Sequence, residues 1–430
     1  IFWDTTKEKE QYLSPLGLGY IATYLEKAGI DVTIVDCVKE RKSVTDIANF
    51  INKMHPDYIG INIFTQNYEM VKFIIESIEI PCDCFIGGQA VKSIYFDILH
   101  WDTQNRLNII IGEGEFIIPA LVLGLCNQIP EEQKNQKFVY RVNKDSEYFP
   151  EDISNVFLDR RYLGNEIVDN QEIAIITSRG CAFDCAFCGG ARSLNKDVTT
   201  RIRTEESVIM EIKEILSTYP DIQSIRILDD LFLRNGKSID MANNIFSKFP
   251  QLSWRGMVHV LSLIGNIEKV KDLHNGRCRE LFIGIESGSE RMRKKINKLG
   301  SSDDVITVSK EILENGIDLK GYFIYGFPEE TKEDFQKTYD LAFKIKEISL
   351  KTPGTFRTSV FQFRPYHGTQ LYNEIVKSTG IIHGCEFNKS ISQFEGRSQF
   401  NFEFGNYSAE IDEMLNEYII KTQKLTEEEQ

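Results

Sequence analysis

CAFDCAFC, residues 181–188, is the stretch on which the interpretation of this chain depends, because it places three cysteines within eight positions. The other six of the nine cysteines are scattered over the rest of the 430 residues. Cys181, Cys185 and Cys188 follow the spacing C-x3-C-x2-C. A structural zinc site needs four closed ligands, usually from two C-x2-C pairs. Only one such pair is present, so zinc is the weaker interpretation, together with unligated thiols.

An iron–sulfur cluster accounts better for three thiols in one loop. Thiolates hold cluster iron, and the loop is short enough to reach several corners of one cube. Three ligands on a four-iron cube leave one iron without a protein ligand, and an open metal position keeps a site reactive. The missing fourth cysteine therefore indicates a catalytic cluster.

The composition is that of a globular protein, with 42% apolar and 27% charged residues. The length predicts about two or three domains. The net charge of −14 disfavours nucleic acid and anionic membranes as partners. No apolar run is long enough to span a bilayer, and the opening IFWD lacks the pattern of a secretion signal. With an odd number of cysteines, we expect a protein of the reducing cytoplasm.

Short apolar runs alternate with helical patterns along the first part of the chain. This alternation predicts an α/β fold with a Rossmann-like, doubly wound parallel sheet over residues 1–126. Ligands of such sheets bind beyond the carboxyl ends of the strands, where Gly87–Gly88 and residues 112–115 fall. The expected strands are residues 31–36, 57–64, 83–89 and 108–115.

A second alternating series covers residues 171–383, after a polar stretch at 127–170 that we predict to be a linker. Its six β/α units predict a partial (β/α)6, TIM-like barrel, because a closed barrel needs eight. Residues 384–430 are expected to form a short cap, irregular at first and then helical from 410 to about 424. The expected strands are residues 172–178, 224–230, 252–260, 280–287, 319–327 and 356–365.

The cysteine spacing, with Phe187 before the last cysteine and the loop after the first barrel strand, resembles the radical S-adenosylmethionine (SAM) superfamily. The resemblance implies a 4Fe-4S cluster on the three cysteines. Its open iron would bind the amino and carboxylate groups of SAM, and one electron would cleave the sulfonium to give a 5′-deoxyadenosyl radical. A reducing partner such as flavodoxin or ferredoxin is implied as well.

Two strand ends are similar to further motifs of that family. LFIGIESGS (281–289) implies that Glu286 binds the SAM ribose, with Ser287 nearby; the alternative is an ordinary strand-end turn. GYFIYGFPEE (321–330) is similar to the segment that contacts adenine, although Gly-x-Pro is also a common turn. The residues implied by this second segment are Gly326, Phe327 and Pro328.

RILDDLF (226–232) resembles the family segment that binds the SAM amino group. Asp229 and Asp230 are the candidates, since an ammonium needs an acceptor; a helix cap is the alternative for either. We expect Arg255 and Arg364 to point toward the barrel mouth, where either would bind the SAM carboxylate or a substrate anion. Exposed or core-edge positions are the alternatives for both arginines.

The front segment resembles the cobalamin-binding domain that precedes the barrel in one large subfamily, through residues 14–36, FIGGQAV (85–91) and IGEGE (111–115). The chain lacks the Asp-x-His-x-x-Gly motif that supplies a cobalt ligand. Cobalamin is therefore expected without a protein ligand on cobalt, or the fold has been kept without the cofactor. The residues implied to contact cobalamin are Thr65, Gly87, Gly88, Gly112 and Gly114.

Together these resemblances imply a radical SAM enzyme that methylates an unactivated carbon of a small molecule or natural product, using cobalamin. The alternatives are a dehydratase, epimerase or rearranging enzyme with a vestigial front domain, or a non-catalytic redox or cobalamin sensor. Methylthiolation of tRNA is disfavoured because an extra cysteine set is missing. Tyr366, His367 and Tyr407 are candidates for substrate contacts, with packing as the alternative role.

Overall fold

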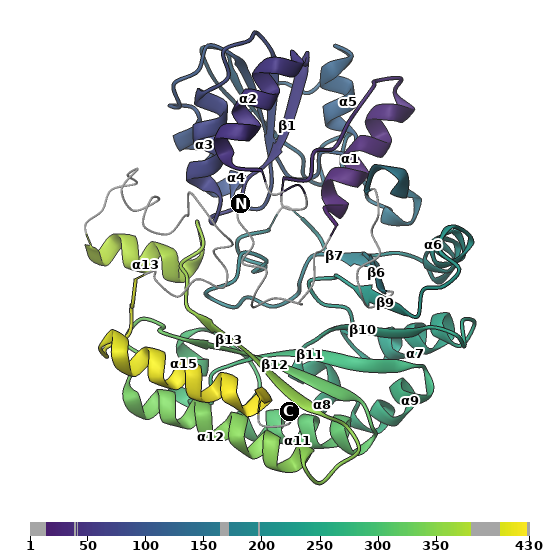
Figure 1. Ribbon diagram of the computed structural model, residues 1–430, viewed down its shortest axis with the longest axis vertical. Helices are drawn as coiled ribbons and strands as arrows, with labels where there is room; N and C mark the ends of the chain where they lie inside the picture. Colours follow the sequence, from purple (N-terminus) through teal and green to yellow (C-terminus); the bar gives the residue numbers. More distant parts are fainter. Residues whose placement is uncertain are drawn as a thin grey trace.

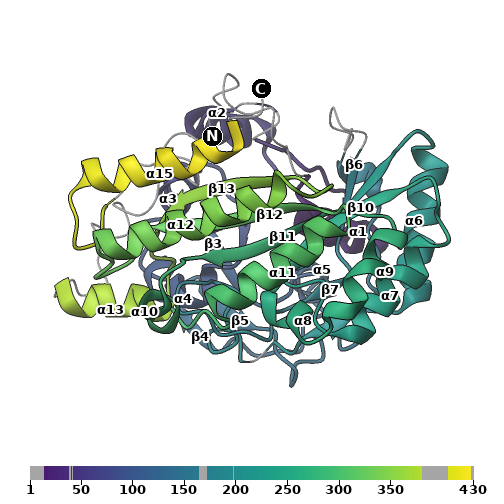
Figure 2. The same cartoon turned by 90° about the horizontal axis from the view of Figure 1, so that it is seen from below.

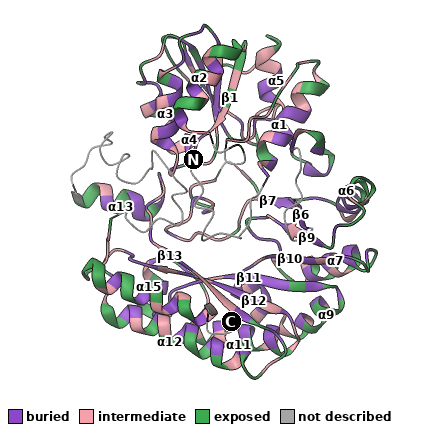
Figure 3. Ribbon diagram, in the orientation of Figure 1, coloured by how far each residue is buried: buried purple, intermediate pink, exposed green. Residues whose placement is uncertain are grey.

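The computed structural model describes residues 14–37, 40, 42–163, 172–196, 198–379 and 405–427. Two α/β units face each other across a layer of loops (Figure 1). Figure 3 shows that buried residues follow the strands of both units, while the exposed residues lie on the outer faces of the helices. Each unit therefore has its own core.

The first unit is built on a sheet with the strand order β1-β2-β3-β5-β4, in which only β4 runs antiparallel to its neighbour. Alternate residues of the strands pack into two separate clusters, one on each face of the sheet. Helices cover both faces, which confirms the predicted doubly wound sheet. The strands are β1 (Tyr58–Asn62), β2 (Asp83–Gly87), β3 (Arg106–Ile111), β4 (Glu132–Lys134) and β5 (Lys137–Arg141).

The helices of this unit divide between the two faces. On one face, α1 (Leu16–Lys27) and α5 (Ile117–Val122) contribute to the cluster around Phe85 and Ile110. The other face is covered by α2 (Val44–Met54), α3 (Tyr68–Glu76) and α4 (Val91–Ile98).

Two expectations for this region were wrong. Residues 31–36 form no strand, and their side chains are at best half-buried. The expected linker 127–170 contains the strands β4 and β5, which extend the first sheet. β4 was not predicted because its sequence, Glu-Gln-Lys, has no apolar residue. It is an edge strand, which backbone hydrogen bonds hold in place and which needs few apolar residues. Residues 164–171 of that segment lie outside the described chain.

The second unit is an open sheet of six parallel strands in the order β6-β9-β10-β11-β12-β13. Helices cover its outer face, while one further helix, α13 (Gln370–Thr379), lies apart from them and packs against the segment around Ala186 (Figures 1 and 2). This is the predicted partial barrel. The strands are β6 (Glu172–Ile175), β9 (Ser224–Ile227), β10 (Ser253–Val258), β11 (Cys278–Glu286), β12 (Asp318–Tyr325) and β13 (Phe356–Gln362).

Side chains alternate along these strands, so that apolar residues face the helices and the inner face carries many polar residues. The helices are α6 (Glu205–Thr218), α7 (Gly236–Phe246), α8 (Val260–Ile264), α9 (Val270–Asn275), α10 (Glu290–Lys295), α11 (Ser302–Glu314), α12 (Lys332–Ser349) and α13 (Gln370–Thr379).

The predicted helical cap is α15 (Asp412–Glu427), which packs on β13 and α12. Leu415, Tyr418 and Ile419 bury its apolar face in the barrel core. Residues 384–404, the irregular part of the predicted cap, lie outside the described chain. Among the helices that the structure describes, none is both long and apolar enough to cross a bilayer.

Candidate active site

The three cysteines lie on a loop whose base is closed by a short antiparallel pair, β7 (Ser178–Arg179) and β8 (Arg201–Ile202). Tight turns fold the loop, with the Cys188 N–H donating to the Cys185 carbonyl at 3.1 Å. Burial raises the pKa of all three thiols, to about 12 for Cys188, and the other two sulfurs add to the effect at Cys188. The three side chains therefore lie in one desolvated region.

Three cysteine thiols from one loop are the kind of donor set that holds an iron–sulfur cluster, in which each thiolate binds its own iron. In the described part of the chain, no group of three His, Cys, Asp or Glu side chains is arranged to hold one metal ion. The Gly190 N–H also lies 3.3 Å from the Cys188 sulfur, and such hydrogen bonds tune iron–sulfur clusters.

Glu286 ends β11 beside this loop and has a strained backbone, with φ of +63°, which is rare for a residue other than glycine. Burial raises the pKa of its carboxyl, while the Lys298 ammonium at 3.4 Å opposes that rise. A side chain at Gly284 would collide with the Glu286 carboxylate and approach Lys298. The packing therefore preserves this carboxylate–ammonium pair.

Lys298 is a site residue that the sequence analysis missed. Burial raises the pKa of the Cys181 and Cys185 thiols, and Lys298 is close enough to oppose the rise in both. The lysine is itself buried. Its ammonium therefore stands between Glu286 and the cysteine loop. No short motif marks it, because it reaches the site from the turn after α10.

The two adjacent aspartates have different environments. Asp229 is buried and accepts hydrogen bonds from the Thr177 N–H at 2.7 Å, the Thr177 hydroxyl at 2.6 Å and the Ser178 hydroxyl. These hydrogen bonds join the segment after β9 to the segment after β6 and occupy both carboxylate oxygens of Asp229. Asp230 is exposed, yet desolvation raises the pKa of its carboxyl, which places it in a recess. A methyl group built on Gly190 would contact both Asp230 and the Cys188 sulfur.

The Gly-Phe-Pro segment after β12 mainly organises the protein. The Gly326 and Phe327 N–H groups donate to one oxygen of the Glu330 carboxylate, at 2.7 and 3.0 Å. Burial raises the pKa of Glu330 to about 8, against the effect of these hydrogen bonds. The ring of Phe327 is fully buried, while Pro328 is half-buried.

The predicted residues Phe187 and Ser287 have packing contacts. The Phe187 ring lies 5.6 Å from that of Phe327, which attaches the cysteine loop to the end of β12. The Ser287 hydroxyl is fully buried and lies 3.1 Å from the Thr338 hydroxyl on α12. Both contacts support the site from behind.

Arg255 does not lie at the barrel mouth, so its predicted role in binding an anion was wrong. Its guanidinium contacts Glu172 at 2.6 Å and Glu280 at 3.0 Å, and all three residues are buried. Glu172 is the first residue of β6 and Glu280 the third of β11, so the network lies near the amino ends of the strands. The alternation of a strand shows which face a residue occupies but not its depth in the barrel.

We expect Arg255→Met to destabilise the fold by about 3–5 kcal/mol, because it leaves buried carboxylates without their shared cation. SAM binding by the fraction that remains folded should not change. Chemical denaturation measures the first effect and calorimetric titration the second. A large loss of SAM affinity in a variant with unchanged stability would contradict this assignment.

Two predicted glycines, Gly88 and Gly112, are required by packing at the carboxyl edge of the first sheet, whereas at Gly114 a side chain would meet only the flexible ends of other side chains. Gly88 has φ of +120°, and a side chain there would lie 2.5 Å from the Ile63 carbonyl oxygen. Gly112 has φ of +107° and lies against the Val142 carbonyl, while Gly114 lies against Ile118.

Gly87 differs from Gly88 and Gly112, because a side chain there would come no closer than 4.0 Å to the nearest atom outside its own segment. No neighbouring atom therefore requires glycine at position 87, and the space beside it is open to a ligand.

Thr65 lies at a contact between the two units. Its hydroxyl lies 2.8 Å from the ring Nδ1 of His367 and accepts the His367 backbone N–H at 3.1 Å. The Gln66 side-chain amide donates to the Tyr366 hydroxyl at 3.2 Å. In this structure the Thr65 hydroxyl thus contacts both the ring and the backbone of His367, while its contact with cobalamin stays a prediction.

The acidic residues of the Gly-Glu-Gly-Glu motif also join the two units. Glu113 contacts Arg179 at 2.9 Å and the Arg201 Nη1 at 3.0 Å, and Glu115 contacts Arg179 at 2.7 Å. Both arginines lie on β7 and β8, at the base of the cysteine loop, and all four residues are largely buried. The motif thereby fixes the cysteine loop against the first sheet.

Other predicted residues gather near the same place. Burial raises the pKa of Tyr366, and Cys188 is near enough to raise it further. Arg364 is near enough to lower the pKa of both Tyr366 and Tyr407, against the effect of burial. A side chain at Gly189, next to Cys188, would collide with Gln89, which follows Gly88 on the first unit. Loops of both units therefore meet beside the cysteines.

Two family models match the chain: the radical SAM superfamily over residues 175–342 and the B12 binding domain over residues 5–122. An uncharacterized methyltransferase of Pyrococcus horikoshii is 28% identical over 86% of this chain and 80% of its own length. Cytidylyl-2-hydroxyethylphosphonate methyltransferase of Streptomyces wedmorensis is 24% identical over 84% of this chain and 78% of its own.

Two solved structures share the fold. The radical SAM methyltransferase TsrM of Kitasatospora setae superposes with a TM-score of 0.63 at 18% identity, covering 85% of this chain and 74% of TsrM. The cobalamin-dependent SAM radical enzyme OxsB gives a TM-score of 0.60 at 17% identity, covering 85% of this chain and 58% of OxsB. The chain thus spans about three fifths of OxsB.

Proposed function

This chain belongs to the radical SAM superfamily and carries a B12-binding domain, and we propose that it is a cobalamin-dependent enzyme that methylates an unactivated carbon of a small molecule. The observation that carries the proposal is the meeting of the two units at the cysteine loop. The loop is fixed from below by Glu113 and Glu115 and touched from the side by Gln89. Groups bound to the two units would face one shared space.

On the barrel side, we assign Cys181, Cys185 and Cys188 to the 4Fe-4S cluster. When bound, the cluster supplies the electron that cleaves SAM, and cobalamin supplies the methyl group. Glu286 would accept hydrogen bonds from the ribose hydroxyls of SAM, since a carboxylate only accepts. Its buried position beside Lys298 orients the carboxylate and keeps water from it.

The amino acid end of SAM needs an acceptor and a cation. We assign the amino group to Asp230, because the carboxylate of Asp229 is already occupied by Thr177 and Ser178. The carboxylate of SAM is assigned to Lys298, which replaces Arg255 in this role. An ammonium has three donors, so Lys298 can contact a second anion while it keeps Glu286.

On the other side, Gly87 would allow the closest backbone approach to cobalamin, because no packing contact explains it. Arg364, Tyr366 and Tyr407 are assigned to the substrate. We place the protein in the reducing cytoplasm, since the eight cysteines that the structure describes are all free thiols.

The products of SAM distinguish methylation from its alternatives. Anaerobically reconstituted protein with a small reductant should form 5′-deoxyadenosine, and S-adenosylhomocysteine should appear only when cobalamin is also loaded. Chromatography of both nucleosides measures this, and absorption spectra verify the loading. A dehydratase, epimerase or rearranging enzyme would form 5′-deoxyadenosine alone or recycle SAM. Absence of both products would favour a sensor.

A further inference from the structure

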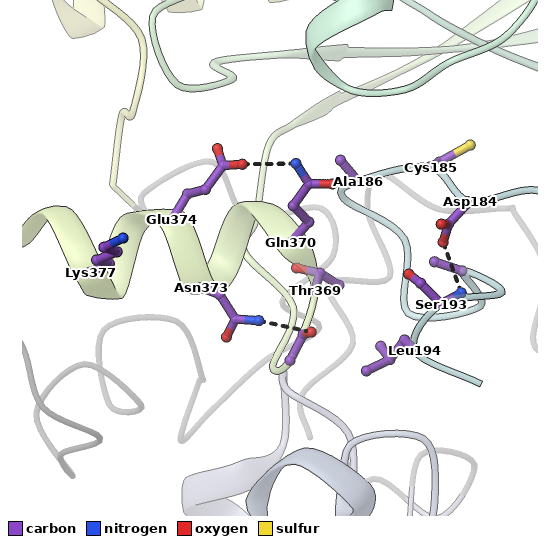
Figure 4. Close-up of a pocket in the computed structure, with 12 residues that line it drawn as sticks. Asp184, Cys185, Ala186, Ser193, Leu194, Thr369, Gln370, Asn373, Glu374 and Lys377 are labelled. Atoms are coloured by element: carbon purple, nitrogen blue, oxygen red, sulfur yellow. Dashed lines mark hydrogen bonds between the residues drawn. The ribbon is translucent and has the colours of Figure 1, made fainter. Parts of the chain in front are cut away.

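A groove of about 500 Å³ lies between the cysteine loop and α13. Figure 4 shows that α13 forms one side of it and the loop the other. The Cys185 sulfur points away from α13, so the groove borders the outer side of this ligand's backbone. It is therefore distinct from the recess of Glu286 and Lys298. Its polar lining includes Asp184, Ser193, Gln370, Glu374 and Lys377.

The backbone of residues 184–186 in the cysteine loop separates the groove from the Cys185 sulfur. The Ala186 N–H donates to the Ile296 carbonyl after α10, and the Leu371 N–H on α13 donates to the Ala186 carbonyl. The Asn297 amide donates to the Asp184 carbonyl at 2.7 Å. Ends of two helices thus hold the outer face of the cysteine loop, and a protein bound in the groove would lie next to a cluster ligand.

Basic residues from two segments lie at this face, and we call Arg192, Lys196 and Lys377 the basic collar. All three are exposed. The Arg192 N–H donates to the Phe183 carbonyl at 2.9 Å and the Ser193 N–H to the Asp184 carboxylate at 2.9 Å, so the segment that carries Arg192 and Lys196 lies against the cysteine loop. Lys377 lines the groove itself. The acidic residues in the lining are Asp184 and Glu374.

The collar contrasts with the charge of the whole protein. The net charge of −14 would repel an acidic partner over most of the surface. A local cationic patch overcomes this at short range, because salt screens distant charges beyond about 10 Å at 0.1 M ionic strength. The collar thus directs an acidic partner to a face that borders the backbone of the cluster ligand Cys185.

We propose that this groove and its basic collar are the docking site of a small acidic one-electron carrier, a flavodoxin- or ferredoxin-type protein, that reduces the cluster. One electron leaves the reduced flavin or iron–sulfur group of the carrier, which becomes oxidised, and enters the oxidised cluster; no bond is formed or broken at the groove. The inference rests on the proposed function, since it requires the cluster. Such transient electron-transfer contacts are small, typically below about 1,200 Å².

The test compares two triple charge reversals with the same change in net charge. One carries Arg192→Glu, Lys196→Glu and Lys377→Glu in the collar. The control carries Lys213→Glu, Lys310→Glu and Lys344→Glu on outer helices, where all three lysines are exposed. Stopped-flow absorbance follows oxidation of a reduced flavodoxin by each reconstituted protein. Freeze-quench electron paramagnetic resonance follows the cluster, and photoreduced deazaflavin serves as a small uncharged reductant.

We expect the collar variant to react with the carrier about tenfold more slowly than wild type, and the control to react within about twofold of it. With deazaflavin, all three proteins should be reduced at one rate. For wild type, raising the ionic strength from 0.1 M should slow the reaction with the carrier. Equal slowing in both variants, or faster reduction at higher salt, would overturn the docking site. A wild-type protein that deazaflavin cannot reduce to a paramagnetic cluster would overturn the proposed function as well.

Discussion

Replacing Cys188 by alanine is expected to abolish SAM cleavage, the largest effect that any single substitution should have on this protein. Cys188 is one of three protein ligands that we assign to the cluster, and the Gly190 N–H approaches its sulfur. With two ligands left, the cube would have two open irons and no stable attachment. Iron bound after reconstitution should fall well below the about four atoms per chain of a complete cluster.

Cys126→Ala is the matched control, because Cys126 is also a free thiol but lies near the end of the first unit, away from the loop. It should bind iron and cleave SAM as wild type does. Iron analysis, absorption spectra and 5′-deoxyadenosine formation measure the three properties. If Cys188→Ala retained a full cluster and SAM cleavage, another residue would have to be the third ligand, and the assignment of the loop would be wrong.

The sequence predicted elements better than it predicted contacts. Apolar periodicity located the strands of the barrel and placed Glu286 at the end of β11, because both properties are local. The strand expected at 31–36 failed for the opposite reason. Its alternation satisfies the local pattern, but it pairs with no strand among the residues that the structure describes, and pairing depends on the rest of the fold.

The errors in the site have a shared physical origin. Arg255 was predicted to point toward the barrel mouth, yet its position along the barrel depends on the register of the strands that bring Glu172 and Glu280 to it. Glu113 and Glu115 were noticed only as part of a glycine motif, and their partners Arg179 and Arg201 lie many residues away. Ion pairs between distant segments carry no local sequence signal.

The contact between Lys298 and Glu286 also carried no local sequence signal. The second large expected effect concerns this pair and is a loss of SAM affinity. Glu286→Gln keeps the size of the side chain but removes the charge that would strengthen hydrogen bonds to the ribose. Such bonds contribute about 1.5–3 kcal/mol, so SAM should bind roughly 10- to 150-fold more weakly. Lys298→Met should weaken binding as well, because it removes the cation and leaves the Glu286 carboxyl buried without it.

The double variant distinguishes a SAM site from a salt bridge that only supports the fold. If both groups bind SAM directly and act on each other, the loss of binding free energy in the double variant should be smaller than the sum of the two single losses, because neither partner is left unpaired. Titration calorimetry with the reconstituted cluster gives each Kd, and the cluster's paramagnetic spectrum should shift on SAM addition only where SAM binds. Lys294→Met, an exposed lysine on the preceding helix, is the control and should keep wild-type affinity. Unchanged affinity in both single variants would instead mean that the strained carboxylate at the end of β11 and its ammonium partner stabilise the strand end and do not contact the nucleotide.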